Sequence, residues 1–149
     1  MLARAADSMF WLARYIERAE NLARILDVQE TFARDSGGRQ DWRMVLVINA
    51  DAEAFYKLHT EAVSANVLRF YITERSNPTS IFAAVHAARE NARALRPLIS
   101  TEMWRQLNML YNRLLALKPA DVAEEKLSGL CDWIKRGCDA HTGDRKSVV

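Results

Sequence analysis

Residues 12–26 read Leu12-Ala13-Arg14-Tyr15-Ile16-Glu17-Arg18-Ala19-Glu20-Asn21-Leu22-Ala23-Arg24-Ile25-Leu26. Apolar side chains recur here about every 3.6 residues, which is typical of an amphipathic helix. These apolar positions are Leu12, Tyr15, Ile16, Ala19, Leu22, Ala23 and Leu26. The pattern predicts a helix that begins at Asp7 or Ser8, either of which can cap it, and runs to about Arg34. The segment Asp35-Ser36-Gly37-Gly38 then ends it, because glycine readily adopts the left-handed conformation after a helix.

Residues 42–59 give a weaker signal than the first helix. The run Met44-Val45-Leu46-Val47-Ile48 is also compatible with a short strand. No partner strand is evident elsewhere, and an isolated strand leaves its backbone groups unpaired. We therefore predict a helix across this segment.

The remainder of the chain carries further helix signals. We predict a helix over residues 64–73 and another that starts with Asn77 as N-cap and Pro78 in its first turn. That helix ends before Pro97, and Ser100 or Thr101 caps the next one. Pro119 begins the last helix, which we expect to end near Gly137, so that residues 138–149 form a flexible tail.

Length and composition exclude several classes of protein. The chain has 149 residues, half of them hydrophobic and only 5 of them glycine, so one domain with a sizeable core is expected. The net charge of +2 does not suggest a nucleic-acid binder, which normally has a clear basic excess. No apolar run approaches the roughly 18 residues of a membrane span, and the first residues do not read as a signal peptide. We therefore expect a cytoplasmic protein that binds neither nucleic acid nor membrane.

The cysteines and histidines give no sign of a metal or catalytic centre. Cys131 and Cys138 are seven positions apart, so on a helix their Cα atoms would be about 10 Å apart, beyond disulfide reach. We predict two buried free thiols. The three histidines, His59, His86 and His141, share no ligand spacing. No cofactor, metal or catalytic residue is therefore predicted.

The most informative polar residues lie on the first helix. Six polar residues share the side opposite the apolar stripe: Arg14, Glu17, Arg18, Glu20, Asn21 and Arg24. They are compatible with a solvated charged face or with a polar site that faces a neighbouring helix. A carboxylate beside arginines stays ionised, so Glu17 would serve as an anchor or a ligand more readily than as a general acid.

A related Glu-Asn pattern recurs in the helix after Pro78, in the segment Ala87-Ala88-Arg89-Glu90-Asn91-Ala92-Arg93. Asn91 lies beside small alanines, which would let another helix approach closely. It is either a structural amide or a contact across a helix interface. Arg89, Arg93 and Arg96 lie on the opposite flank, where exposure is the default.

These two patterns lead to a specific hypothesis. Glu17, Arg18 and Asn21 would approach Asn91 across a groove between the two helices. Glu20 would then be the exposed residue of the first pattern, paired with an arginine one turn along the helix.

The segment Arg14-Tyr15-Ile16-Glu17-Arg18-Ala19-Glu20-Asn21 resembles the signature of the alpha-E family of bacterial helical proteins. Further blocks that resemble the family lie at residues 2–12, 77–81, 88–93 and 99–108, so the resemblance covers most of residues 1–110. The family has no established activity. Its genes lie beside those of circularly permuted ATP-grasp proteins and transglutaminase-like proteins, which implies a role in peptide or amide-bond synthesis or modification. The resemblance also implies a longer protein with a second Glu-Arg motif, of which residues 1–149 would be the N-terminal half.

Together these observations predict an all-α protein, an antiparallel bundle of five to six helices in one domain. Its function would be that of an accessory domain that docks an ATP-grasp or transglutaminase-like partner. The alternative is a substrate-binding or catalytic subunit with a polar site at the motif. Exposed surface meant for a missing half would also favour homo-oligomers. The candidate binding residues are Arg14, Glu17, Arg18, Asn21, Arg24, Arg89 and Asn91.

Overall fold

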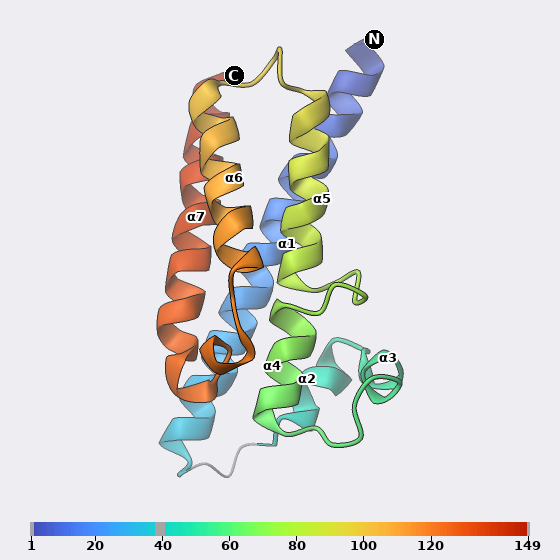
Figure 1. The fold of residues 1–149 in the computed structure, drawn as a ribbon, viewed down its shortest axis with the longest axis vertical. Helices are drawn as coiled ribbons and strands as arrows, with labels where there is room; N and C mark the ends of the chain where they lie inside the picture. The colour runs from blue at the N-terminus through green and yellow to red at the C-terminus, as the bar shows by residue number, and fades with distance from the viewer. Residues whose placement is uncertain (1, 38–40, 149) are drawn as a thin grey trace.

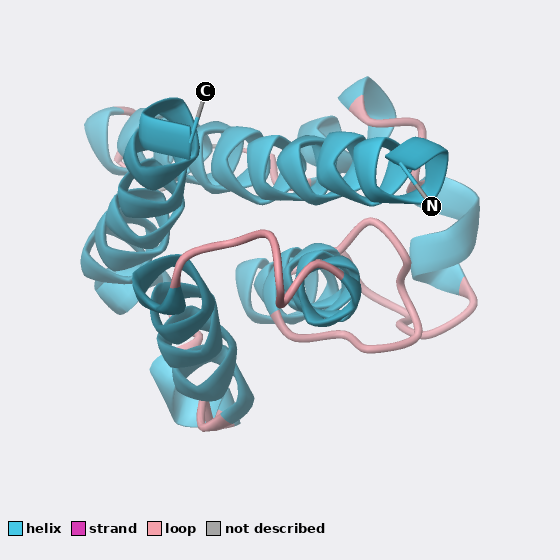
Figure 2. Ribbon diagram, turned by 90° about the horizontal axis from the view of Figure 1, so that it is seen from above, coloured by secondary structure: helices cyan, strands magenta, loops and turns pink. Residues whose placement is uncertain are grey.

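A computed structural model describes residues 2–37 and 41–148, with side chains up to Asp139. Four long helices run up and down along the bundle: α1 (Leu2–Asp35), α5 (Ile81–Ala94), α6 (Thr101–Leu115) and α7 (Leu127–Val148) (Figure 1). Helix α1 packs against both α5 and α7, and α6 packs against the same two helices from the other side. Seen from above, the described residues contain helices and loops and no strand (Figure 2). The all-α prediction is confirmed.

The predicted helix over residues 42–59 is instead two short helices, α2 (Arg43–Ile48) and α3 (Ala52–Tyr56). The break lies at Ala50, whose φ of 57° is in the left-handed region. The backbone N–H of Asp51 then donates to the carbonyl of Leu46 at 2.8 Å, which closes the end of α2. This division gives the described residues seven α-helices rather than five to six.

Helix α4 (Ser64–Ile72) matches its prediction to within a residue and lies below α5 in Figure 1. The start of α5 does not match. Its N-cap is Ser80, whose hydroxyl accepts from the N–H of Ala83 at 3.0 Å. Asn77 is buried; its amide donates to the carbonyl of Phe70 at 2.9 Å and accepts from the N–H of Thr79 at 3.1 Å. Asn77 therefore satisfies a carbonyl in the last turn of α4, and it is not the N-cap of α5.

Helix α6 begins as predicted, because the Ser100 hydroxyl accepts from the N–H of Met103 at 3.0 Å. Pro119 opens a turn of 3-10 helix (Pro119–Asp121) rather than the last α-helix, and a second such turn (Glu124–Lys126) precedes α7. The predicted end near Gly137 is wrong, since α7 continues to Val148. An isolated glycine costs a helix only about 1 kcal/mol, which burial of the neighbouring Cys138 can offset.

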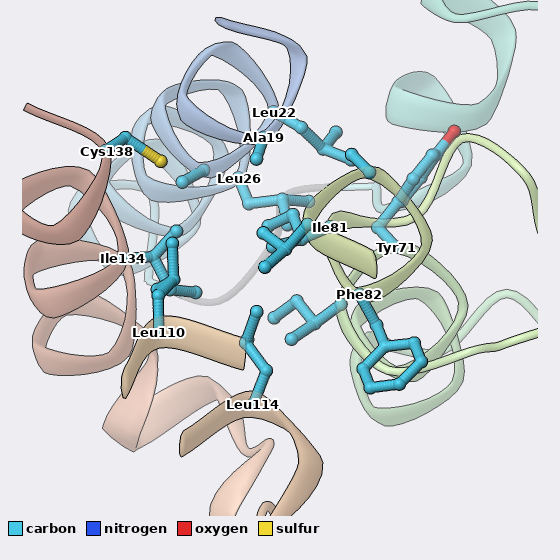
Figure 3. Close-up of a cluster of buried hydrophobic side chains, with 14 of the residues drawn as sticks. Ala19, Leu22, Leu26, Tyr71, Ile81, Phe82, Leu110, Leu114, Ile134 and Cys138 are labelled. Carbon is cyan, nitrogen blue, oxygen red and sulfur yellow. The ribbon is translucent and has the colours of Figure 1, made fainter. Parts of the chain in front are cut away.

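The core lies between the four long helices, with α4 contributing at one end (Figure 3). Every apolar position predicted for the first helix is buried except Tyr15, which packs against the core from its edge. Core residues on the other long helices include Ile81 and Val85 of α5, Leu107 of α6, and Leu127 and Ile134 of α7. The side chains labelled in Figure 3 are Ala19, Leu22, Leu26, Tyr71, Ile81, Phe82, Leu110, Leu114, Ile134 and Cys138. This arrangement covers α1 on two sides and leaves a third side of that helix open.

Candidate functional site

The open side of α1 carries the Glu-Arg motif. Arg14, Glu17, Arg18, Asn21 and Arg24 are all exposed there. The guanidinium of Arg14 lies 3.9 Å from the Glu17 carboxylate, and about half of each side chain is exposed. The guanidinium of Arg18 lies 5.5 Å from the ring centre of the neighbouring Tyr15. Of the two interpretations of the sequence, the exposed charged face is therefore the one observed.

The groove expected between the motif and Asn91 is not formed. Glu17, Arg18 and Asn21 point to solvent, whereas Asn91 is half-buried. Its amide donates to the carbonyl of Ala87 at 2.9 Å, one turn earlier in its own helix. Asn91 is thus a structural amide within α5.

Arg89 is the candidate residue whose surroundings differ most from the prediction. Its side chain is only 22% exposed and lies against α6. Its Nε donates to Oδ1 of Asn108 at 2.7 Å, and its guanidinium lies 4.6 Å from the ring centre of Tyr111. Arg93 and Arg96 are exposed, as expected.

Glu20 is the polar residue that the sequence interpretation misplaced. Its side chain is 14% exposed, whereas that of Glu17 is 50% exposed. It forms the predicted ion pair with Arg24 and also a hydrogen bond with the carboxyl of Asp139, which reaches it from α7. Burial, followed by the hydrogen bond and charge of Asp139, raises the pKa of Glu20, and Arg24 opposes this shift. The apolar residues four positions before Glu20 and three positions after it, Ile16 and Ala23, are both buried. They were the sequence signal that Glu20 lies at the edge of a helix interface.

A second polar cluster lies further along the α1–α7 interface. Lys135 Nζ is 3.3 Å from Oδ2 of Asp27. Glu30 is 6% exposed, pairs with Arg34 at 3.7 Å, and keeps its Oε2 atom without a hydrogen-bond partner. Glu30 follows Leu26 by four positions and precedes Ala33 by three, so the apolar period of α1 places it on the buried side even though its side chain is charged.

Both cysteines are fully buried, as predicted. Burial is the main cause that raises the pKa of each thiol to about 12. The charges of Asp27 and Glu30 add to the effect at Cys131, and those of Glu20 and Asp139 add to it at Cys138. A thiol with such a pKa stays protonated at neutral pH, so both cysteines act as packing residues rather than nucleophiles.

The described part of the chain holds no group of three or more histidine, cysteine, aspartate or glutamate side chains able to bind a metal ion. Across residues 2–37 and 41–148, no helix is long and apolar enough to cross a membrane. A groove of about 760 Å³ lies between the start of α1 and the end of α5, lined mainly by apolar side chains that include Leu2, Pro97 and Leu98. None of the candidate residues borders this groove.

Large apolar side chains flank the motif on the open side of α1. Phe10 is 55% exposed and Trp11 37% at one end, and Ile25 is 40%, Val28 54% and Phe32 60% exposed at the other. At 100° per residue, these five and the motif residues fall within an arc of about 140°. We call this surface the motif face. It consists of Phe10, Trp11, Arg14, Glu17, Arg18, Asn21, Arg24, Ile25, Val28 and Phe32.

Comparison with known proteins identifies the family of this chain. A family model for Alpha-E, described as a predicted alpha-helical domain with a conserved ER motif, matches residues 1–147. No curated protein and no solved structure matches the chain. Because the match extends over nearly all 149 residues, the chain belongs to the Alpha-E family.

Proposed function

We propose that this chain is an accessory domain that docks a protein partner through the motif face. The observation that carries the proposal is the exposure of the Glu-Arg motif together with the apolar side chains on either side of it. Groups of large exposed apolar side chains rimmed by polar residues commonly mark an interaction site in a folded protein. Aromatic residues and arginines are also enriched in the buried centres of interfaces.

The interactions within the motif support the same function. Arg14 and Glu17 make only a long, exposed contact with each other, and Arg18 has no carboxylate within ion-pair distance among the described residues. Exposed pairs of this kind contribute only about 0–1 kcal/mol to stability. The motif side chains are therefore available to a partner at little cost to the fold.

The partners that we propose follow from the family. They are a circularly permuted ATP-grasp protein and a transglutaminase-like protein of a system that makes or modifies peptide or amide bonds. The alternative role, a substrate-binding or catalytic subunit, would call for motif side chains that converge on a single ligand. The spread of the motif along an exposed helix supports docking rather than that role.

The test is a binding measurement with both purified partner proteins from the same genome, such as biolayer interferometry. Phe32→Asp places a charge at the apolar end of the motif face, and we expect it to weaken binding at least about tenfold. Met109→Asp on α6 is the matched control, because Met109 is 59% exposed and Phe32 60%. Failure of both proteins to bind, or an equal loss with both variants, would contradict the proposal.

Self-association through the same face is the competing outcome. Sedimentation equilibrium of the chain alone distinguishes it from docking. We expect Phe32→Asp to alter the binding of the partner protein even at concentrations where the chain is monomeric. A dimer that Phe32→Asp dissociates, without binding to either partner protein, would instead assign the motif face to a second copy of the chain.

A further inference from the structure

A second surface, on α5 and α6, combines arginines with aromatic rings. Three guanidinium groups, those of Arg75, Arg89 and Arg96, lie over the rings of Phe82, Tyr111 and Trp104. We call these six residues the arginine–aromatic strip. The strip is on different helices from the motif face, so the inference below does not depend on the proposed function.

The strip follows α5 along its length. The guanidinium carbon of Arg75 lies 5.0 Å from the ring centre of Phe82, at the start of the helix. The guanidinium carbon of Arg96, beyond the end of the helix, lies 5.1 Å from the ring centre of Trp104. At 1.5 Å per residue, positions 82 and 96 are about 21 Å apart. Between them, Arg89 contacts Tyr111 at 4.6 Å and Trp104 at 5.9 Å.

The two outer arginines have no acidic partner. Arg89 uses its Nε on Asn108 and has Glu90 3.7 Å from its Nη1. In the described part of the chain, no carboxylate lies within 4.0 Å of the guanidinium nitrogens of Arg75 or Arg96. Both side chains are exposed.

The nearby carboxylates are engaged elsewhere. Glu74 accepts a hydrogen bond from Ser76 at 2.6 Å. Glu90 lies 3.7 Å from both Arg89 and Arg93. Glu102 pairs with Arg105 at 3.6 Å. The acidic groups of this surface therefore do not neutralise Arg75 and Arg96.

Contact with the aromatic rings holds these guanidinium groups in an orientation that suits the binding of an anion. A guanidinium that lies on a ring keeps its planar orientation, and its N–H donors, which lie in the plane of the group, stay free at the edge. That fork of donors matches a carboxylate, and fixing it in advance lowers the entropy lost on binding. We propose that the arginine–aromatic strip binds an acidic polypeptide segment, with one carboxylate on Arg75 and another on Arg96.

The ring contacts favour a polypeptide over a single-stranded nucleic acid. Nucleic acids bind such surfaces largely by stacking their bases on open ring faces. Each ring here already contacts at least two side chains. Trp104 has Arg89 and Arg96, and Phe82 has Arg75 and the ring of His86. Tyr111 has Arg89 and the ring of Phe82. The anionic groups of a ligand can therefore reach the guanidinium groups directly, whereas a base that stacks on Phe82, Tyr111 or Trp104 would have to displace an arginine.

The test uses the whole chain and a fluorescein-labelled oligoglutamate of about 14 residues, which is long enough to reach along α5 in an extended conformation. Binding is followed by fluorescence anisotropy at physiological ionic strength. We expect Arg75→Gln and Arg96→Gln each to weaken binding roughly tenfold, because each removes charge-assisted hydrogen bonds. Arg113→Gln is the matched control, since Arg113 stacks on Trp133 at 4.3 Å on the opposite side of α6. We expect that variant to bind within about twofold of the wild type.

Arg96→Lys tests whether binding depends on the fixed geometry of the guanidinium group or only on its positive charge. It also replaces the glutamine variants in the test if one of them does not fold. It keeps the charge and loses the planar fork, so we expect an affinity loss of about threefold or more. The proposal is overturned if the oligoglutamate does not bind, or if Arg113→Gln loses as much affinity as the strip variants. It is also overturned if Arg96→Lys binds like the wild type, or if an oligothymidylate of equal length binds more tightly and depends on Arg75 and Arg96. Phe32→Asp should leave the binding of the oligoglutamate unchanged. Loss of partner binding at the motif face can therefore be distinguished from loss of peptide binding at the arginine–aromatic strip.

Discussion

Lys135 of α7 lies 3.3 Å from the carboxylate of Asp27 of α1, and each of the two side chains is 25% exposed. The pair joins residues 108 positions apart in the chain, across an interface that buries Cys131 completely. It is more shielded from water than the other ion pairs of α1 that involve exposed arginines. It is therefore the ion pair through which the packing of the first and last helices is best measured.

A double-mutant cycle with Asp27→Ala and Lys135→Ala should give a coupling free energy of about 1 kcal/mol, at the upper end of the range for exposed pairs. The physical reason is partial burial, which reduces screening of the two charges by water. Urea unfolding provides the free energies. The control cycle uses Glu53 of α3 and Lys57 just after it, whose side chains are 90% and 74% exposed, and its coupling should be close to zero. Equal couplings in the two cycles would show that the α1–α7 pair is solvated in solution.

The second prediction concerns Glu20 and pH. Because burial and Asp139 raise its pKa, the folded state binds a proton at Glu20 more tightly than the unfolded state does. The stability linked to this group is complete below the ordinary pKa of a glutamate and is lost as the pH rises through the raised value. Glu20→Gln, which cannot ionise, should therefore gain in stability relative to the wild type as the pH rises from about 4 to 7.

The expected gain at neutral pH is at most about 1 kcal/mol, since the variant also loses the ion pair with Arg24. Urea midpoints of both proteins across this pH range provide the measurement. Glu17→Gln is the control, because Glu17 is half-exposed and makes only a long contact with Arg14. The stability difference between Glu20→Gln and the wild type could instead stay constant, or fall as the pH rises. Either result would show that the Glu20 carboxyl is not partly buried beside Asp139 in solution.

The third prediction compares two glycines of α7. A Cβ atom on Gly129 would have no heavy atom within 4 Å, so Gly129→Ala should stabilise the protein by about 0.5–1 kcal/mol through helix propensity. A Cβ atom on Gly137 would lie 3.1 Å from Cδ1 of Leu110 on α6. Leu110 is in the core, so it has little room to move.

Gly137→Ala should therefore gain less stability than Gly129→Ala, or lose stability. Thermal unfolding of the two single variants gives the comparison directly. A gain at position 137 equal to that at position 129 would mean that α6 and α7 approach each other less closely than the structure describes.

The long helices could be predicted from the sequence because their apolar positions recur at the helical period. Leu12, Ile16 and Leu26 are each at most 1% exposed, as the helical period predicted. The cap at Ser100 was also predictable, since a serine before a regular helix has a defined role. The division of residues 42–59 was not, because an alanine at positive φ, here Ala50, has no signal in the sequence.

The candidate site was harder to predict than the fold. Glu17 and Glu20 are three residues apart, so a helical pattern places them only about 60° apart around α1, and it does not say where the cover provided by a later helix ends. In the structure α7 covers the flank with Glu20 and leaves Glu17 exposed. The same limit applies to Arg89, which became half-buried because α6 places Asn108 and Tyr111 beside it.

The central claim is that the motif face is a docking surface whose polar side chains contribute little to the fold. The most direct measurement is the double variant Glu17→Ala with Arg18→Ala, studied for both stability and binding to the ATP-grasp protein. Its control is Asp132→Ala with Arg136→Ala, which removes an exposed pair on α7 whose side chains are 59% and 73% exposed.

We expect both double variants to change the free energy of unfolding by less than about 1 kcal/mol. We expect the motif variant alone to weaken partner binding at least about tenfold. Loss of about 3–5 kcal/mol of stability in the motif variant would reveal a buried polar network instead. Unchanged binding by a stable motif variant would contradict the docking role of the motif face.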